Sequence, residues 1–585
     1  MVHRLKANVV SLQLSEQSPL LSSNGRSSSA TRACQARNDG TAASHAADSR
    51  QDLGDKRGWS RVRDMAIFAW ALVATTAVIV LAVWTQHNQQ TTRPHHGQGA
   101  SKRNLVFMVS DGMGPASVSM ARSFGQFVHH VGPRDTLRLD AHLWGSSRTR
   151  SSNSLVTDSA AGATAFACGK KSYNGAISML PDYRPCASVL EAAKRAGYAT
   201  GLVVTTDVTD ATPACFASHV LLRQMQDEIA LQEIGQGPLG RSVDLIFGGG
   251  RCHFVPNTTA GSCRADNVDV VALARKQHGW TYMDSRKAFD ALDSGQRASL
   301  PLLGLFAPTD VPFELDRRHM AHVYPSLAEM TRTALGALAK ATAHTDKGFF
   351  LLVEGSRIDH AGHINDPAAQ VHEVLEYDAA FAAVMDFWND SDTETLVVGT
   401  SDHETGGLAT ALELPDQLPV YAWYPHVLAN ASASCELLSA RLKAHVAANA
   451  PRRVSRRALC RWINDELILP GLGIADASDS ELNHLADDTE GSAETFAAMI
   501  SRRARIGWST HGHSAVDVNT YSSGATTAAS AIRGNVENTD IGRFLAHYLD
   551  VDVDELTNEL RNKTPVHLAT AHGLHDSWQG KRVPL

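Results

Sequence analysis

From about residue 104 onward, short apolar runs alternate with longer stretches in which apolar residues recur at helical spacing. Short apolar runs bounded by turn residues are typical of strands that are buried on both faces of a sheet. Five core strands are expected, at residues 105–110, 199–205, 243–247, 349–353 and 395–399. This alternation predicts an α/β fold, a three-layer sandwich around a largely parallel central sheet.

The clearest helical pattern covers residues 368–388, where apolar side chains stand at 371, 374, 375, 381, 384, 385 and 388. Ser188 is expected to cap a helix over 189–196 that ends at Gly197, because glycine is favoured just beyond a helix C-terminus. The small residues after Ser159 predict a tightly packed helix that begins at this serine. A helix N-terminus favours anions, including a bound phosphate.

Residues 65–84 contain no charged side chain, and only Thr75 and Thr76 among these 20 residues are polar. The length matches the hydrocarbon thickness of a bilayer, so we expect a transmembrane signal-anchor helix. A buried core helix or a cleaved signal peptide is the alternative, but the run follows a polar segment of 64 residues. Basic residues are denser before the run than after it, which predicts a single-pass type II protein with residues 85–585 luminal.

The polar segment 1–64 is expected to be a disordered cytosolic tail. Within it, residues 16–21 (Glu-Gln-Ser-Pro-Leu-Leu) resemble an acidic dileucine signal, which sorting adaptors read when they direct membrane proteins to vacuoles or lysosomes. A chance pair of leucines is the alternative. Four sequons on the expected luminal side are candidate glycosylation sites, at Asn257, Asn389, Asn430 and Asn562.

Seven of the eight cysteines lie on the expected luminal side. Cys252 and Cys263 flank a short loop and form the first disulfide candidate, while Cys435 with Cys460 forms a weaker second one. An odd luminal count leaves at least one thiol free, and Cys168 is expected to be that thiol.

The strongest chemical signal is the segment 353–363, Val-Glu-Gly-Ser-Arg-Ile-Asp-His-Ala-Gly-His. An expected strand leads directly into Glu354. Asp359 and His363 follow at a spacing of four, which puts both side chains on one face of a helical turn. A carboxylate and an imidazole on one face can bind one metal ion, and Glu354 can serve a neighbouring ion from a different element.

Three other expected strands are followed by ligands of the same kind. Asp111 follows the first strand, Asp210 and Thr212 follow the second, and Asp402 and His403 follow the fifth. Binding sites in open α/β sheets form beyond the carboxyl ends of the strands, so these side chains are expected to meet. The 27 histidines also permit a metal-rich site, and the pattern predicts a multi-metal enzyme.

Each motif also has a purely structural interpretation. Residues 111–114 could be only a tight turn, residues 402–403 the start of a capped helix, and residues 510–513 an exposed loop. Residues 248–251 lack the lysine and the spacing of a P-loop and are interpreted as a strand end with a turn. No Ser-His-Asp arrangement accompanies Ser159, so a metal is the natural activator of this serine.

Five motifs together resemble those of the alkaline phosphatases, in the same order along the chain. They are S-D-G-M-G at 110–114, V-T-D-S-A-A-G-A-T-A at 156–165, D-A-T-P-A at 210–214, V-E-G-S-R-I-D-H-A-G-H at 353–363 and S-D-H-E-T-G-G at 401–407. The resemblance covers about residues 100–550. The anchored topology with a sorting tail is similar to that of the fungal vacuolar members of this family.

The resemblance implies hydrolysis of phosphate monoesters through a phosphoserine intermediate, with two Zn²⁺ and one Mg²⁺, in the vacuolar lumen. Ser159 would be the nucleophile, with Asp158 in a supporting role. Arg223, eleven residues after Thr212, would hold the phosphoryl group, although an ordinary surface arginine is the alternative. The implied ligands are Asp359, His363 and His513 for the first zinc, Asp111, Asp402 and His403 for the second, and Asp111, Thr212 and Glu354 for magnesium, with Asp210 acting through a metal-bound water.

Two positions remain open. His511 and His513 could each be the last zinc ligand, and the distance from His513 to Asp517 fits the family pattern better. His360 takes a position that varies in the family between Lys, His and Trp. Its combination with Asp210 is expected to influence magnesium affinity, phosphate release and optimum pH.

The resemblance further implies a homodimer that acts on a broad range of small phosphomonoesters. We expect a luminal linker at 85–103, a catalytic domain at 104–550 whose segment 405–507 is partly accessory or dimer-capping, and a C-terminal tail at 551–585.

The rival functions are a nucleotide pyrophosphatase, phosphodiesterase or sulfatase with a related metal core, and a metal- or phosphate-binding protein without catalysis. The net charge of −7 argues against a nucleic-acid partner.

Overall fold

The computed structural model describes residues 65–78, 102–415, 418–449, 455–524 and 527–564. The chain forms two compact units, 1–98 and 99–585. In the first unit, residues 65–78 are helical. Across the described ranges, none of the helices combines the length and hydropathy needed to cross a membrane. Residues 79–84 of the expected span, the expected cytosolic tail at 1–64 and its dileucine motif lie outside the described residues.

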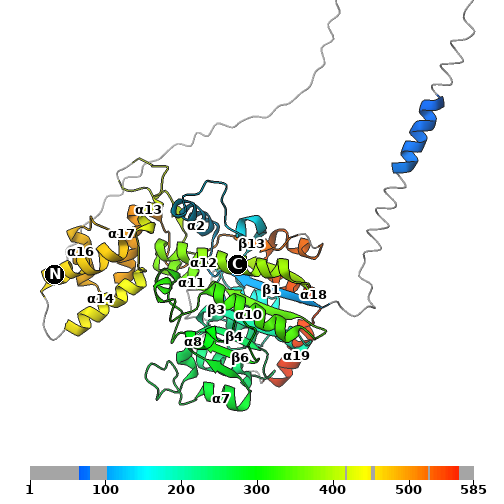
Figure 1. Ribbon diagram of the computed structural model, residues 1–585, viewed down its shortest axis with the longest axis horizontal. Helices are drawn as coiled ribbons and strands as arrows, with labels where there is room; N and C mark the ends of the chain where they lie inside the picture. Colours follow the sequence, from blue (N-terminus) through cyan, green and yellow to red (C-terminus); the bar gives the residue numbers. More distant parts are fainter. Residues whose placement is uncertain (1–64, 79–101, 416–417, 450–454, 525–526, 565–585) are drawn as a thin grey trace, which may run out of the picture. The chain divides into compact units, whose positions relative to one another are not determined.

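A sheet of ten strands organises the second unit, in the spatial order β14-β2-β13-β8-β1-β7-β3-β4-β6-β5 (Figure 1). Neighbouring strands run parallel except at β13, which is antiparallel to both β8 and β2. The strands are β1 Arg103–Val109, β2 Leu143–Arg148, β3 Ala199–Asp207, β4 Leu245–Gly249, β5 Thr281–Met283, β6 Leu302–Leu305, β7 Phe349–Glu354, β8 Glu394–Thr400, β13 Val518–Ser522 and β14 Gly534–Glu537. Two small antiparallel ladders lie outside this sheet: β9 (Glu404–Thr405) pairs with β12 (His513–Ser514), and β10 (Ala409–Thr410) pairs with β11 (Ile506–Gly507).

The five expected strands are β1, β3, β4, β7 and β8, and they lie together in the middle of the sheet. Their continuous apolar runs arise because both faces are covered. In β1, Leu105, Phe107 and Val109 pack into one hydrophobic core, whereas Val106 and Met108 pack into the core on the opposite face. The prediction of an α/β sandwich around a largely parallel sheet is therefore confirmed for this unit.

Helices cover both faces of the sheet. On one face lie α3 Ser159–Cys168, α4 Val189–Arg195, α5 Ala211–Ala217, α6 Gln226–Leu231, α7 Val270–Gln277 and α18 Asn538–Leu549. On the other lie α2 Pro115–Val128, α8 Arg286–Asp290, α10 Leu327–Thr342 and α12 Pro367–Asp390. The remaining helices near the sheet are α9 Glu314–Arg317, α11 Arg357–Ile364 and α19 Val553–Lys563.

Three expected helices form close to their predicted bounds. The long helix is α12, and α4 ends one residue before the expected bound. The Ser188 side chain accepts a hydrogen bond from the backbone N–H of Glu191, whose carboxylate in turn accepts one from the N–H of Ser188. Helix α3 begins at Ser159, as predicted.

A separate group of helices lies beside α2 and α11 (Figure 1). Its members are α13 Pro425–Ala429, α14 Cys435–Asn449, α15 Arg456–Trp462, α16 Asp479–Asp487 and α17 Ser492–Ala504. They share a third hydrophobic core, to which α2 contributes Met120 and Phe124. All five fall within the expected accessory segment 405–507, whose role in a dimer stays a prediction.

The cysteine pairing differs from expectation in two respects. Cys252 and Cys263 form a disulfide, as predicted, but Cys168 is not free and is bonded to Cys186. Cys168 is the last residue of α3, and the chain returns so that the two Cα atoms lie 6.0 Å apart.

The second predicted pair, Cys435 with Cys460, is also wrong, because both thiols are free. Cys435 is buried at the start of α14, whereas Cys460 in α15 faces the carbonyl oxygen of Leu482. Cys215 is the third free thiol among the described residues, and it is buried.

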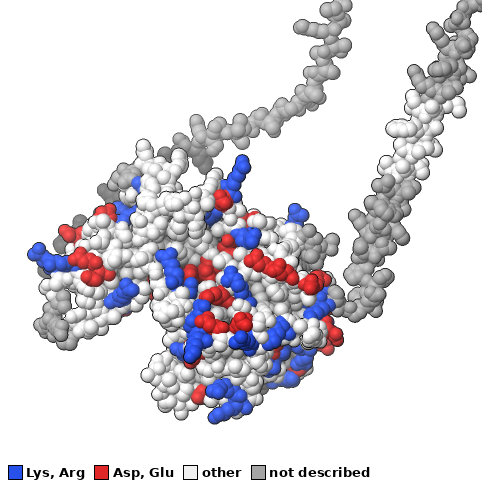
Figure 2. Space-filling model, viewed as in Figure 1, with Lys and Arg blue, Asp and Glu red and all other residues white. Residues whose placement is uncertain are grey.

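The surface of the second unit carries charges of both signs. Figure 2 shows basic and acidic side chains interspersed on the visible face.

All four sequon asparagines are exposed, namely Asn257, Asn389, Asn430 and Asn562. Their glycosylation stays a prediction that is compatible with the fold.

Candidate active site

Four adjacent strands deliver polar side chains to one edge of the sheet. In spatial order they are β8, β1, β7 and β3, all parallel. Asp402 and His403 follow β8, Asp111 follows β1, and Glu354 ends β7. Because parallel strands end at the same edge, residues far apart in the sequence meet there, as predicted.

The first candidate metal-binding triad consists of Asp359, His363 and His513, whose potential ligand atoms lie within 4.8 Å of one another. Asp359 and His363 stand one turn apart on α11, with His363 Nε2 3.2 Å from Asp359 Oδ2. His513 comes from β12, and its Nε2 lies 3.1 Å from His363 Nε2. The carbonyl oxygen of Thr157 lies 2.8 Å from His513 Nδ1, which fixes the ring with Nε2 toward the triad.

His511, the other candidate for this position, does not join the triad. Its Nδ1 lies 2.8 Å from the backbone oxygen of His363, and its side chain is exposed. The structure therefore groups His513, rather than His511, with Asp359 and His363.

The second triad, Asp111, Asp402 and His403, is buried. His403 Nε2 lies 3.2 Å from Asp402 Oδ2 and 3.5 Å from Asp111 Oδ1. The backbone N–H of Gly112 donates to Asp402 Oδ1 over 3.3 Å. Gly112 has a φ of +73°, and a Cβ there would come within 2.6 Å of the Cα of Asp359, so only glycine fits this turn.

A third group of oxygen ligands lies beside the second triad. Glu354 is buried, and its Oε2 accepts a hydrogen bond of 2.6 Å from Ser356. Thr212 is buried in α5, the helix that Asp210 caps by accepting a hydrogen bond from the N–H of Ala211.

Ser159 is the first residue of α3 and is buried next to the second triad. Its Oγ lies 3.1 Å from His403 Nε2. Asp158 caps the helix, with one carboxylate oxygen accepting from the N–H of Ala161 and the other from the N–H of Gly175. Gly162 lets α3 approach closely, since a Cβ there would lie 3.0 Å from the Cβ of Asp402.

Arg223 lies in a turn rather than on a helix, and it points toward the same site. Its Nη2 donates to Asp210 Oδ1 over 2.8 Å, and its Nη1 lies 3.6 Å from Asp158 Oδ2. Burial would lower the pKa of this guanidinium, but Asp210 and Asp158 raise it. The interpretation of Arg223 as an ordinary surface residue is therefore not supported.

His360 lines a pocket of about 320 Å³ together with Asp210 and Arg223. Its Nδ1 lies 3.2 Å from the carboxylate of Asp310, a residue in none of the recognised motifs. Burial would lower the pKa of His360, but Asp310 raises it to about 9. Sequence reasoning missed Asp310, because it lies 50 residues before His360 and the tertiary fold alone brings them together.

The carboxylates of the site carry strongly perturbed pKa values. Burial, reinforced by Asp402 and Asp359, raises the pKa of Asp111 well above its usual range. Burial raises the pKa of Glu354 to about 8 and, with Asp359, that of Asp402 to about 7. Burial would also raise the pKa of Asp359, but His363 and His513 hold it well below its usual value.

This donor set fits divalent cations. Three buried oxygens, Asp111 Oδ1, Asp402 Oδ2 and Thr212 Oγ1, have no hydrogen-bond partner in the described part of the chain. Bound cations would satisfy these oxygens and offset the repulsion between the carboxylates. Imidazole with carboxylate suits zinc, and carboxylate with hydroxyl suits magnesium.

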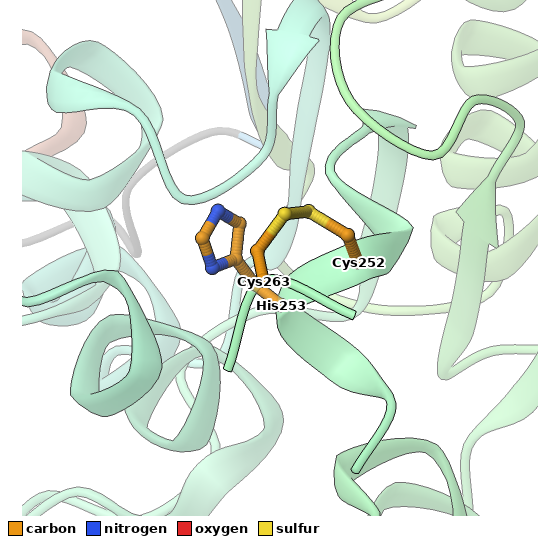
Figure 3. Close-up of side chains that lie close together, drawn as sticks. All are labelled: Cys252, His253 and Cys263. Carbon is orange, nitrogen blue, oxygen red and sulfur yellow. A yellow bond between two sulfur atoms is a disulfide. The ribbon is translucent and has the colours of Figure 1, made fainter. Parts of the chain in front are cut away.

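A further group of possible ligands, Cys252, His253 and Cys263, lies outside this site. Figure 3 shows the His253 ring beside a bond between the two sulfur atoms. Both thiols are consumed by the disulfide, so this cluster is covalent rather than metal-binding.

Comparison with known proteins agrees with this site. The alkaline phosphatase family profile matches residues 102–551. The repressible alkaline phosphatase of Saccharomyces cerevisiae is 52% identical over 482 residues, which are 79% of this chain and 84% of the relative. The crystal structure of Thermus thermophilus alkaline phosphatase superposes with a TM-score of 0.63 and 27% identity, covering 81% of this chain and 99% of that one.

A variant of the alkaline phosphatase from the Antarctic bacterium TAB5, with Mg bound in its M3 site, is 25% identical with a TM-score of 0.51. It aligns over 78% of this chain and 100% of its own.

An α/β sandwich with acidic and histidine side chains gathered beside a helix-capping serine is typical of metal-dependent phosphohydrolases. With the profile match and the identity to the yeast enzyme, the chain belongs to the alkaline phosphatase family. It is an enzyme that hydrolyses phosphate monoesters.

Proposed function

We propose that the chain hydrolyses phosphate monoesters through a phosphoserine intermediate at Ser159, with two Zn²⁺ and one Mg²⁺ bound beside it. The observation that carries the proposal is the distance of 3.1 Å between Ser159 Oγ and His403 Nε2, which joins the serine to the second triad. Asp359, His363 and His513 would hold one zinc. Asp111 would serve both the second zinc, with Asp402 and His403, and magnesium, with Thr212 and Glu354.

When bound, these cations supply Lewis acidity, which favours ionisation of the serine hydroxyl and of water and stabilises charge on the departing alcohol oxygen. The chain's own residues orient the reactants. Arg223 offers a planar fork of donors for two phosphoryl oxygens, and Asp210 and Asp158 hold that fork over the site. The N-terminus of α3 adds a favourable field for the phosphoryl group.

The reaction then has two steps. Ser159 Oγ forms a bond to phosphorus while the bond from phosphorus to the alcohol oxygen breaks, which releases the alcohol after protonation. Water next attacks phosphorus, the bond to Ser159 Oγ breaks, and inorganic phosphate leaves. All of the contacts proposed above are made to the phosphoryl group, and none is made to the alcohol. This supports a broad range of small phosphomonoesters as substrates.

A test of the nucleophile compares Ser159→Ala with the unchanged protein in hydrolysis of p-nitrophenyl phosphate with zinc and magnesium. Turnover should fall by about three orders of magnitude or more, because the substitution removes the hydroxyl proposed to form the covalent intermediate. Ser439→Ala, which removes a buried hydroxyl among the accessory helices, is the matched control and should keep full activity. Acid quenching followed by peptide mass spectrometry should find phosphate on Ser159, and substantial turnover by Ser159→Ala would refute this role.

We further infer that the enzyme is anchored by residues 65–84 in the vacuolar membrane, with its catalytic unit luminal, as a glycosylated homodimer sorted through its tail. The uncharged run, the basic residues before it and the exposed sequons support this assignment. Carbonate extraction of membranes from cells that express the full chain tests it. The protein should stay in the membrane pellet, and a version that begins at Gly99 should not.

A further inference from the structure

The pocket beside Arg223 contains two pairs of oppositely charged side chains. One pair is Arg223 with Asp210, and the other is His360 with Asp310. All four residues line the same pocket of about 320 Å³, together with Asp207, Gln224 and Gln226. The first pair belongs to the site already described, whereas Asp310 has no assigned role.

Asp310 lies in the loop that follows β6, and hydrogen bonds to neighbouring strand ends hold this loop in place. Its Oδ1 accepts a hydrogen bond of 3.0 Å from the backbone N–H of Asp207, at the end of β3. On either side of it, the carbonyl oxygen of Thr309 accepts from the N–H of Gly250, and the N–H of Val311 donates to the carbonyl oxygen of Thr205. The loop is thereby tied to two neighbouring strand ends.

The second oxygen of Asp310 faces the site. Oδ2 lies 3.2 Å from His360 Nδ1 and 3.6 Å from Arg357 Nε. Arg357 is itself fixed, since it donates to the carbonyl oxygen of Val311 and to Glu436 and lies over the Phe313 ring. His360 Nδ1 therefore faces Asp310 at 3.2 Å and Arg357 Nε at 3.4 Å, whereas Nε2 has no hydrogen-bond partner among the described residues.

We propose that Asp310 is a positioning residue, which orients His360 so that its free nitrogen serves the bound phosphoryl group and the product phosphate. The carboxylate acts through the imidazole and does not itself touch substrate. Partners of this kind fix ring orientation; around metal-bound histidines their loss costs about 10- to 100-fold in affinity or activity, and we expect the lower end of that range for His360. The proposal rests on the role of the Arg223 pocket in binding phosphate.

Asp310→Asn separates this role from support of the loop. The asparagine keeps an oxygen that can accept from the N–H of Asp207, but the amide nitrogen that then faces His360 Nδ1 is a donor and cannot accept a hydrogen bond from it. The inhibition constant of inorganic phosphate should rise about tenfold. Asp316→Asn is the matched control, because that buried aspartate also holds a backbone N–H, at Ser434, and lies outside the pocket; it should leave the constant unchanged.

A double-mutant cycle with His360→Ala provides the decisive measurement. If Asp310 acts through the imidazole, Asp310→Asn should change the inhibition constant less than about twofold once His360 is removed. Equal effects in both backgrounds, or no effect of Asp310→Asn alone, would overturn the proposal. The unfolding temperature of each variant shows whether it is folded.

Calorimetric titration of phosphate into the zinc- and magnesium-loaded proteins repeats this comparison without turnover. If the unchanged protein binds phosphate but hydrolyses no monoester, the proposed function fails while the role of Asp310 is still tested.

Discussion

At the scale of single residues, buried carboxylates dominate the charge of the active site. Asp111, Glu354 and Asp402 are buried together, and their pKa values are raised by burial and by one another. When no cation is bound, these three carboxyls tend to be protonated, because burying the charged form costs more free energy than burying the neutral form. If cations bind these carboxylates as proposed, then metal binding, proton binding and the stability of the fold are coupled.

The metal-free protein should lose stability as pH rises. Glu354 and Asp402 have pKa values of about 8 and about 7, above those of unfolded carboxyls. A carboxyl whose pKa is raised by folding stabilises the fold below its unfolded pKa, and this contribution is lost as pH rises through the folded pKa. The unfolding temperature measured in chelator should fall from about pH 5 to pH 9. Because cations bind the ionised carboxylates, the gap between metal-loaded and metal-free protein should widen over that range.

Glu354→Gln should narrow the difference in unfolding temperature between metal-loaded and metal-free protein, because it removes one proposed ligand and one titrating group. Glu373→Gln is the matched control, since Glu373 also has a pKa of about 8 but accepts a hydrogen bond from Glu314, away from the metal ligands. If the difference in unfolding temperature between metal-loaded and metal-free protein stays constant with pH when no residue is substituted, the proposed link between metal binding and protonation is contradicted.

At the scale of elements, the close packing of α3 positions Ser159, the proposed nucleophile. All ten residues of this helix are buried, and most are small. Gly542 of α18 lies against it, where a Cβ would come within 2.4 Å of the carbonyl oxygen of Ala165. The two helices can approach this closely only because the contact position has no side chain.

Gly542→Ala should lower the free energy of unfolding by about 1–3 kcal/mol, because the added methyl group must push α18 away from backbone atoms of α3. Gly125→Ala in α2 is the matched control. Its Cβ would meet only Leu375 Cδ2, at 3.6 Å, so the change should be neutral or stabilising by up to about 1 kcal/mol. Denaturant unfolding of both variants measures the difference, and equal effects would show that the helix contact is not tight.

At the scale of the whole molecule, the catalytic machinery belongs to one unit. The second unit, residues 99–585, contains all of the proposed metal ligands together with Ser159 and Arg223. The family match covers residues 102–551. The unit also contains two disulfides, each between residues close in sequence.

The unit that begins at Gly99 should therefore fold and act without residues 1–98. Its kcat and KM for p-nitrophenyl phosphate should agree within about twofold with those of the full chain in detergent, since no catalytic group is removed. The comparison uses protein loaded with equal zinc and magnesium. A large loss of kcat with a normal unfolding temperature would mean that the first unit contributes to the site.

The disulfide pattern should be visible in a non-reducing peptide map. Peptides that join Cys168 to Cys186 and Cys252 to Cys263 are expected. The buried thiols of Cys215 and Cys435 should be alkylated only after unfolding, whereas the half-buried Cys460 should react in the folded protein. A peptide that joins Cys435 to Cys460 would contradict the structure.

Much of the site follows from local sequence. Apolar runs ending in Asp111, Glu354 and Asp402 predict strands with ligands at their ends, because the chain itself fixes that order. The spacing of Asp359 and His363 likewise defines one helix face without any tertiary information. The central strands, their parallel pairing and the ligand types are therefore encoded by the sequence alone.

Only the tertiary structure decides which distant residues become partners. It groups His513 rather than His511 with the first triad, pairs Cys168 with Cys186, and brings Asp310 to His360. These choices depend on how loops and helices pack after the strands have paired, and no periodicity or spacing records that packing. The sequence by itself determined the elements and their chemical groups, whereas packing over long separations decided the contacts that orient them.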